Sequence, residues 1–186
     1  MKRLDALGVA DEVFAGRPMV VTLGATAREL ASLAKRDSHL YLLDSMGLAP
    51  SVGIGLACAG RAPVAVIEGD GSLLMGLTTL ASLAYLRPPG VTLLVLDNHE
   101  HASAAGVATQ AATVSLAQAC RGFGLPTTEV IDAESLRSAL ARGRDSMEVT
   151  VVVASIEPGN APGVPLLLDD PVVIAERFRS FLREGS

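Results

Sequence analysis

The sequence predicts an α/β protein with a doubly wound, six-stranded parallel sheet flanked by helices. Six short apolar runs alternate with segments in which apolar residues recur at helical spacing, the pattern of a parallel sheet covered by helices. The composition agrees, because 49% of the residues are hydrophobic, only 3% are aromatic and 18 are glycine, which favours tight turns over a β-sandwich. No repeat, linker or low-complexity tract divides the chain, so residues 1–186 are expected to form a single domain.

The apolar patterns give the expected elements in chain order. The strands are expected over residues 19–23, 40–43, 64–67, 91–96, 127–131 and 148–156. The helices are expected over residues 1–15, 27–35, 50–60, 73–86, 114–123, 133–143 and 170–182. Thr26 is expected to cap the second helix, with Glu29 completing a capping box. Residues 102–113 have few apolar positions and are expected to form a long loop at the carboxyl edge of the sheet.

One strand–helix–strand unit, residues 64–101, carries a polar residue at the end of each strand. Asp70 follows its first strand in a G-D-G turn, and Asn98 follows its second. Since parallel strands joined by a right-handed crossover end at the same edge, these two side chains are expected to lie close together. Carboxylate and amide oxygens suit Mg²⁺ or Ca²⁺, and Mg²⁺ commonly adds phosphate oxygens and water. Ser72 and the first N–H groups of the helix supply further donors, so the unit predicts a site for a Mg²⁺-bound diphosphate.

The motif and its spacing resemble those of thiamine-diphosphate enzymes, in which G-D-G is followed by a helix and then by a strand ending in Asn-Asn or Asp-Asn. The resemblance implies a diphosphate-type domain of the thiamine-diphosphate-binding fold. It implies that the Mg²⁺ ligands are Asp70, Asn98 and the backbone oxygen of Glu100. It also implies that the cofactor lies against Gly69, Asp70, Gly71, Ser72, Asn98, Glu100 and His101. The alternative is an ordinary doubly wound domain whose G-D-G turn binds no ligand.

A second turn, Asp44-Ser45-Met46-Gly47, follows the expected second strand. It is similar to the G-S-M-G turn of thiamine-diphosphate enzymes, where an apolar side chain holds the two cofactor rings in a bent conformation. The resemblance implies that Met46 is this side chain, that the Asp44 carbonyl accepts a hydrogen bond from the pyrimidine amino group, and that Ser45 and Gly47 border the cofactor. Asp44 departs from the usual glycine. The alternative is that Met46 is an ordinary core residue.

The family also requires a glutamate beside the pyrimidine ring, and that residue lies on a separate pyrimidine-binding domain. The chain therefore resembles a β subunit whose α partner supplies the glutamate in a hetero-oligomer. Over its whole length it looks most like sulfopyruvate decarboxylase β subunits and the C-terminal half of phosphonopyruvate decarboxylases, through segments such as VVTLGATARELASL and IEPGNAPGVPLLLDD. The resemblance implies a thiamine-diphosphate and Mg²⁺-dependent decarboxylase that converts a short anionic 2-oxo acid into CO₂ and an aldehyde.

Two alternatives to this function stay open. One is a carboligating or acyl-transferring thiamine-diphosphate subunit. It is favoured by two departures from the family pattern, Asp44 in place of glycine and Ala105 where the decarboxylases more often carry a Gly-Gly-Gln run. The other is a non-catalytic subunit that binds cofactor or serves as a scaffold. His99 and His101 follow the metal asparagine and are candidates for acid–base catalysis or contact with the substrate anion, His101 before His99. Ordinary loop histidines bonded to the backbone are the alternative.

Charge and cysteine usage restrict the partners and the compartment. The net charge of −5 is spread without a basic run, which argues against nucleic acid as a partner. Cys58 and Cys120 lie in apolar helical patterns without metal spacing and are expected to be buried thiols in a reducing compartment. No signal peptide precedes the first element, and the longest apolar runs have the length of strands. A cytoplasmic protein without membrane contact is therefore expected.

The helix at residues 50–60 consists mostly of small residues. Gly53 and Gly55 each destabilise a helix by about 1 kcal/mol relative to alanine, so we expect another backbone or side chain to approach closely. Close packing on the sheet is one explanation, and contact with a partner subunit is compatible with it. A surface for the partner is expected to expose Gly47, Ala49, Gly53 and Ala57.

Overall fold

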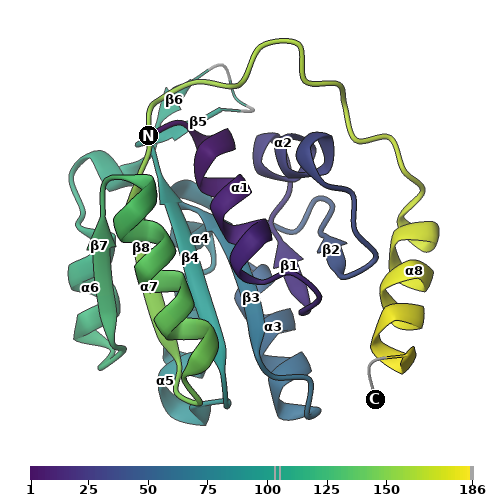
Figure 1. Cartoon of the computed structure of the whole chain (residues 1–186). Coiled ribbons are helices and arrows are strands. Elements are labelled where there is room, and N and C mark those ends of the chain that lie inside the picture. Colours follow the sequence, from purple (N-terminus) through teal and green to yellow (C-terminus); the bar gives the residue numbers. More distant parts are fainter. Residues whose placement is uncertain (103, 105, 185–186) are drawn as a thin grey trace.

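The computed structural model, which describes residues 1–102, 104 and 106–184, has six parallel strands in one central sheet (Figure 1). From edge to edge they are β2 (His39–Tyr41), β1 (Met19–Val21), β3 (Val64–Gly69), β4 (Val91–Asp97), β8 (Thr150–Ser155) and β7 (Thr127–Val130). The predicted doubly wound sheet is confirmed. β2 and β3 lie on opposite sides of β1, so the strand order reverses between β1 and β3. Ligands of such folds bind at this switch point, beyond the carboxyl ends of the strands.

Helices cover both faces of the sheet (Figure 1). One face carries α1 (Arg3–Val13), α2 (Ala25–Leu33) and α7 (Ala133–Asp145). The other carries α3 (Ala49–Cys58), α4 (Asp70–Met75), α5 (Thr78–Leu86) and α6 (Leu116–Gly122). Each face encloses its own buried apolar cluster, and neighbouring strand residues such as Val66 and Ile67 belong to opposite clusters. Because both faces are covered, the strands are apolar throughout, which explains the unbroken hydrophobic runs in the sequence.

The last helix, α8 (Pro171–Glu184), lies beside β2 (Figure 1). It begins at Pro171, one residue after the predicted start, and proline is well suited to the first turn of a helix. Its buried side chains are Ile174 and Phe178. The segment that joins it to β8 passes over the top of the sheet in the view of Figure 1. Among the described residues, no helix is both long enough and apolar enough to cross a membrane.

The prediction of one continuous helix over residues 73–86 is wrong. The structure has two separate helices, α4 and α5, with Gly76 and Leu77 between them. Two backbones meet at this break. A Cβ on Gly76 would overlap the backbone of Gly47, and Gly47 itself has a φ of +76°, which favours glycine. Apolar residues continue at helical spacing on both sides of the break, so periodicity alone did not reveal it.

The predicted capping box of α2 is also wrong. The N-cap is Gly24, with a φ of +76°, and Thr26 lies buried within the first turn. The Glu29 carboxylate is buried and accepts hydrogen bonds from the Arg3 guanidinium and the Ala161 backbone. An ion pair with a residue far away in the sequence thus replaces the local hydrogen bond that a capping box requires.

Two further predictions, of a long loop and of two buried cysteines, need correction. The predicted loop after β4 contains part of a small antiparallel hairpin, β5 (Glu100–His101) and β6 (Val107–Ala108), and a short 3₁₀ helix, η1 (Gln110–Ala112). Ala105, which departs from the family pattern, lies outside the described residues. Cys120 is buried as predicted, but Cys58, the last residue of α3, is exposed.

The small residues expected at a partner surface are buried within this chain instead, namely Gly47, Ala49, Gly53 and Ala57. A Cβ on Gly53 would overlap the Val66 side chain, so this glycine allows α3 to pack closely on β3. A Cβ on Gly55, in contrast, would meet no atom within 4 Å. Close helix–sheet packing therefore accounts for one of the two glycines.

Candidate active site at the carboxyl edge of the sheet

A cavity lies at the switch point, where β1, β3 and β4 end. Its lining comes from these strand ends, the start of α2, the hairpin and the first turn of α1, and comprises Arg3, Thr22, Leu23, Gly24, Ala25, Thr26, Met46, Gly69, Asp70, Gly71, Ser72, Leu96, Asn98, Glu100, His101 and Ala102. Most of the predicted site residues are among them. The exceptions are Asp44, Ser45, Gly47 and His99, which are not part of the wall.

Asp70, the first residue of α4, is only 3% exposed. The Thr109 hydroxyl donates a hydrogen bond to its Oδ2 at 2.6 Å. A Cβ on Gly71 would overlap the His101 ring and the Thr109 methyl group, so the second glycine of the G-D-G turn lets the segment after β4 pack over Asp70. This accounts physically for the second glycine of the motif, whereas a Cβ on Gly69 would meet no atom within 4 Å.

Asn98 reaches the same cavity from the end of β4, because β3 and β4 are parallel and Gly69 pairs with Leu96. Its Oδ1 accepts a hydrogen bond from the Glu100 backbone N–H at 3.2 Å. Its Nδ2 is buried and has no hydrogen-bond partner among the described residues. A buried amide donor without a partner is costly, so this group needs an acceptor inside the cavity.

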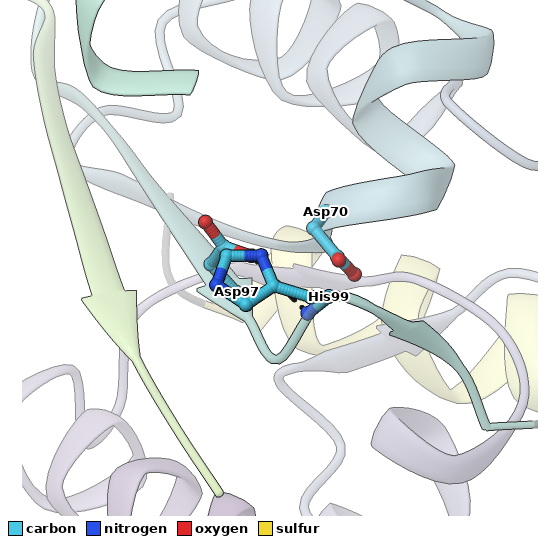
Figure 2. Close-up of side chains that lie close together, drawn as sticks. All are labelled: Asp70, Asp97 and His99. Atoms are coloured by element: carbon cyan, nitrogen blue, oxygen red, sulfur yellow. Dashed lines mark hydrogen bonds and ion pairs between the residues drawn. The ribbon is translucent and has the colours of Figure 1, made fainter. Parts of the chain in front are cut away.

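Asp97 is a residue that sequence reasoning missed. Potential ligand atoms of Asp70, Asp97 and His99 lie within 4.8 Å of one another, and Figure 2 shows the three side chains together. His99, with a φ of +61°, places its Nδ1 3.1 Å from Asp97 Oδ1. Burial raises the pKa of Asp97, His99 opposes this, and the Asp70 carboxylate adds to it. The signal for Asp97 was its position at the end of β4 next to Asn98.

The turn after β2 meets the cavity through Met46, which is half-buried and outside both core clusters. The Gly47 N–H donates to Ser72 Oγ at 2.9 Å, which fixes the turn to α4. Asp44 is exposed and has a φ of +51°. Aspartate tolerates this region better than most residues, so the turn keeps a backbone shape that glycine would also adopt.

A buried carboxyl group supports the floor of the cavity. Glu68, on β3, is fully buried, and burial raises its pKa, whereas hydrogen bonds from Ser72 and Thr22 lower it. The Thr22 and Ser72 hydroxyls lie 3.1 Å apart and both line the cavity. Three side chains and the Gly47 turn thus form one hydrogen-bonded group.

Sequence reasoning also missed the start of α2 and Arg3. Gly24, Ala25 and Thr26 line the cavity, so the N-terminal N–H groups of α2 add to its positive potential. A glycine directly after a strand, followed by a helix, was the available signal. Arg3 gave no local signal, because it is far from the cavity residues in the sequence.

These residues fit a Mg²⁺-bound diphosphate. Asp70 and Asn98, both in the cavity wall, supply hard oxygen donors, which Mg²⁺ prefers. The Asn98 Nδ2 donor lacks a partner among the described residues, and a phosphate oxygen would provide one. Asp70, Asn98 and Glu100 are the residues that would hold the metal. The hydroxyl of Ser72 and the start of α2 would face the phosphates.

Comparison with known families identifies the class of protein. Residues 23–154 match the family model described as "Thiamine pyrophosphate enzyme, C-terminal TPP binding domain". The match covers most of the chain, including the ends of β3 and β4 and all of the described cavity wall except Arg3 and Thr22. The chain therefore belongs to the thiamine pyrophosphate enzyme family and carries its C-terminal cofactor-binding domain.

Its curated relatives are two kinds of decarboxylase. It is 36% identical to phosphonopyruvate decarboxylase of Streptomyces viridochromogenes over 88% of this chain and 42% of that protein. It is 32% identical to sulfopyruvate decarboxylase subunit beta of Methanothermobacter thermautotrophicus over 96% of this chain and 94% of the subunit. The chain thus spans about two fifths of the phosphonopyruvate decarboxylases it matches and nearly the whole of the β subunits.

Solved structures agree on the fold. A thiamin diphosphate-dependent enzyme from Mycobacterium smegmatis superposes with a TM-score of 0.73 at 20% identity, over 85% of this chain and 32% of that one. Benzoylformate decarboxylase from Polynucleobacter necessarius gives a TM-score of 0.71 at 16% identity, over 82% and 32% of the respective chains. At these identities the likeness concerns the fold alone.

Proposed function

We propose that the chain is the β subunit of a thiamine-diphosphate and Mg²⁺-dependent decarboxylase, located in the cytoplasm. Its substrate is a short 2-oxo acid with a second acidic group, of the 3-sulfopyruvate or 3-phosphonopyruvate kind. The observation that carries the proposal is the cavity that joins Asp70, Asn98 and Glu100 to Met46. The similarity of the chain to sulfopyruvate decarboxylase subunit beta, over 94% of that subunit, supports the substrate class.

The residues have distinct tasks in this proposal. Asp70, Asn98 and the backbone oxygen of Glu100 hold Mg²⁺ and thereby the diphosphate. Met46, fixed by the bond from Gly47 to Ser72, would hold the cofactor rings, and the Asp44 carbonyl would accept a hydrogen bond from the pyrimidine amino group. The bound cofactor supplies the electron sink for loss of CO₂, and the protein orients it. His101, in the cavity wall, is the candidate for contact with the substrate anion.

A partner α subunit with a pyrimidine-binding domain completes the site in this proposal. The carboxylates among the described wall residues are Asp70 and Glu100, and both are assigned to the metal region. In this proposal the acid that activates the pyrimidine comes from the α subunit. The name "subunit beta" carried by three similar proteins supports such an assembly.

A substrate panel tests the function. The complex of this chain with its α partner, supplied with Mg²⁺ and thiamine diphosphate, should release CO₂ from 3-sulfopyruvate or 3-phosphonopyruvate and at least about tenfold less efficiently from pyruvate. A complex with Asp70→Asn should retain its fold but lose cofactor and turnover. Equal rates on pyruvate would refute the substrate class, and carbon–carbon bond formation without net release of aldehyde would instead favour a carboligating subunit.

A further inference from the structure

Arg3 occupies a position in the cavity that the proposed function has not used. It belongs to the first turn of α1, and its side chain is only 6% exposed. Together with Asp70 and Asn98 it lines the cavity at the switch point. Among the described residues of the wall it is the only arginine or lysine.

The guanidinium is oriented by contacts from two other segments. Its Nη1 donates to Glu29 Oε1 at 2.9 Å and to Asn160 Oδ1 at 3.1 Å. The Ala161 N–H donates to the same Glu29 oxygen at 3.0 Å. Asn160 Nδ2 in turn donates to the Ala102 carbonyl, in the cavity wall, at 3.3 Å. Both bonds of Arg3 use one nitrogen, whereas a guanidinium carries five N–H donors, so donors remain for a ligand.

The charge balance of the cavity calls for a cation at this place. Asp70 and Glu100 line the wall, Asp97 lies beside Asp70, and Glu29 lies behind Arg3. A diphosphate is a polyanion, and one divalent cation neutralises only part of its charge. A guanidinium is well suited to the remaining phosphate oxygens, because its fixed fork of donors matches their geometry.

We propose that Arg3 binds a phosphate oxygen of the cofactor's diphosphate and that Glu29 and Asn160 position it for this contact. The inference rests on the proposed function, since it requires a diphosphate in the cavity. It explains why a buried ion pair between α1 and α2 borders a polar cavity instead of the apolar core. It also gives the segment between β8 and α8 a task, because Asn160 and Ala161 complete the positioning.

The test uses the full chain with Mg²⁺ and inorganic pyrophosphate, a probe that carries the diphosphate without the rings for which a partner is needed. Phosphorus NMR titration measures the affinity. Arg3→Met should weaken binding at least about tenfold, as expected for loss of a charged hydrogen bond. Arg3→Lys should lose less, because it keeps the charge without the fork. The matched control is Arg17→Met, at an exposed arginine outside the wall, which should bind like the parent.

Two further variants separate phosphate binding from folding. Arg3→Met alone leaves the Glu29 carboxylate buried without its partner, so the double variant Arg3→Met/Glu29→Leu removes both charges. It should fold and still bind pyrophosphate at least about tenfold more weakly than the parent. Glu29→Gln keeps the acceptor for Arg3 and Ala161 but removes a negative charge, and should bind as well as the parent or better. If the pair were only structural, Glu29→Gln and Arg3→Met would lose affinity together with thermal stability.

Two results would overturn the inference in different ways. A folded double variant that binds pyrophosphate like the parent would refute the role of Arg3 and leave the proposed function intact. If the parent does not bind pyrophosphate in the presence of Mg²⁺, or if an Asp70→Asn variant binds it as well as the parent does, the diphosphate site itself is refuted, and with it both proposals.

Discussion

At the residue scale, Asp44 illustrates how a departure from a family motif can be judged from backbone geometry. Its φ of +51° lies in the left-handed region, which glycine adopts freely and aspartate adopts more readily than most residues. The carboxylate is exposed, and Met46 still reaches the cavity. Asp44 therefore gives little support to the alternative of a changed reaction.

Met46 is expected to matter for turnover more than for cofactor affinity. In the complex with the α partner, Met46→Leu keeps an apolar side chain of similar volume and should retain most of the activity. Met46→Ala should lower kcat by about tenfold or more while the Kd for thiamine diphosphate changes less, because bending is needed only for reaction. Steady-state kinetics and calorimetry check the two quantities, and equal kcat in the alanine variant would contradict the assignment.

Some site residues could be predicted from the sequence and others could not, for a physical reason. Asp70 and Asn98 follow strands of one crossover unit, and parallel pairing necessarily brings such ends together. Arg3 and Asn160 reach the site through a contact between residues 157 positions apart, about which local patterns contain no information. Asp97 is an intermediate case. Its position at the end of β4 was predictable from the sequence, but the direction of its side chain was not.

At the element scale, a buried polar cluster ties the edge strand β2 to α1. His39 is 2% exposed, with its Nε2 3.3 Å from Asp11 Oδ1 and its Nδ1 3.1 Å from the Tyr41 hydroxyl. Arg36, just before the strand, forms two hydrogen bonds with Asp11, of 2.5 and 2.6 Å. Burial lowers the pKa of His39 to about 4, Asp11 opposes this, and Arg36 and Arg177 add to it. His39 is therefore neutral in the folded protein at neutral pH.

This pKa has a defined effect on stability. Unfolded His39 has a pKa of about 6.5, so the unfolded state binds a proton between pH 6.5 and 4 that the folded state does not. The contribution of buried, neutral His39 to the free energy of unfolding is complete above pH 6.5 and is lost as the pH falls towards 4. From pH 7 to pH 5 the free energy of unfolding should drop by about 2 kcal/mol more in the parent than in His39→Gln. Urea unfolding at both pH values checks this, and identical drops in the two proteins would refute it.

The break between α4 and α5 depends on a tertiary contact that the spacing of apolar residues does not reveal. Apolar spacing indicated one helix over residues 73–86, but Gly76 packs against Gly47, and that contact interrupts the helix. A separate hydrogen bond from the Gly47 N–H to Ser72 Oγ holds the Met46 turn beside the start of α4, where Asp70 lies. Sequence patterns predicted the strands and most helices because these depend on burial of a face, whereas this break depends on two backbones meeting.

At the scale of the whole molecule, the site is complete at one end only. The cavity wall contains carboxylate and amide oxygens, hydroxyl donors, the start of α2 and the Arg3 guanidinium, all of which suit a Mg²⁺-bound diphosphate. It contains no carboxylate among its described residues beyond Asp70 and Glu100. The small residues that the sequence predicted at a partner surface are buried within this chain, so the proposed α partner would have to contact other residues.

In the proposed function this chain holds the cofactor while another chain makes it reactive. The most direct test is CO₂ release from 3-sulfopyruvate and 3-phosphonopyruvate by the isolated chain, shown by mass spectrometry to be free of partner, with Mg²⁺ and thiamine diphosphate present. We expect no CO₂ release by the chain alone and release from at least one substrate once the α chain is added. Substantial release by the isolated chain would contradict it and would place the activating acid within these 186 residues.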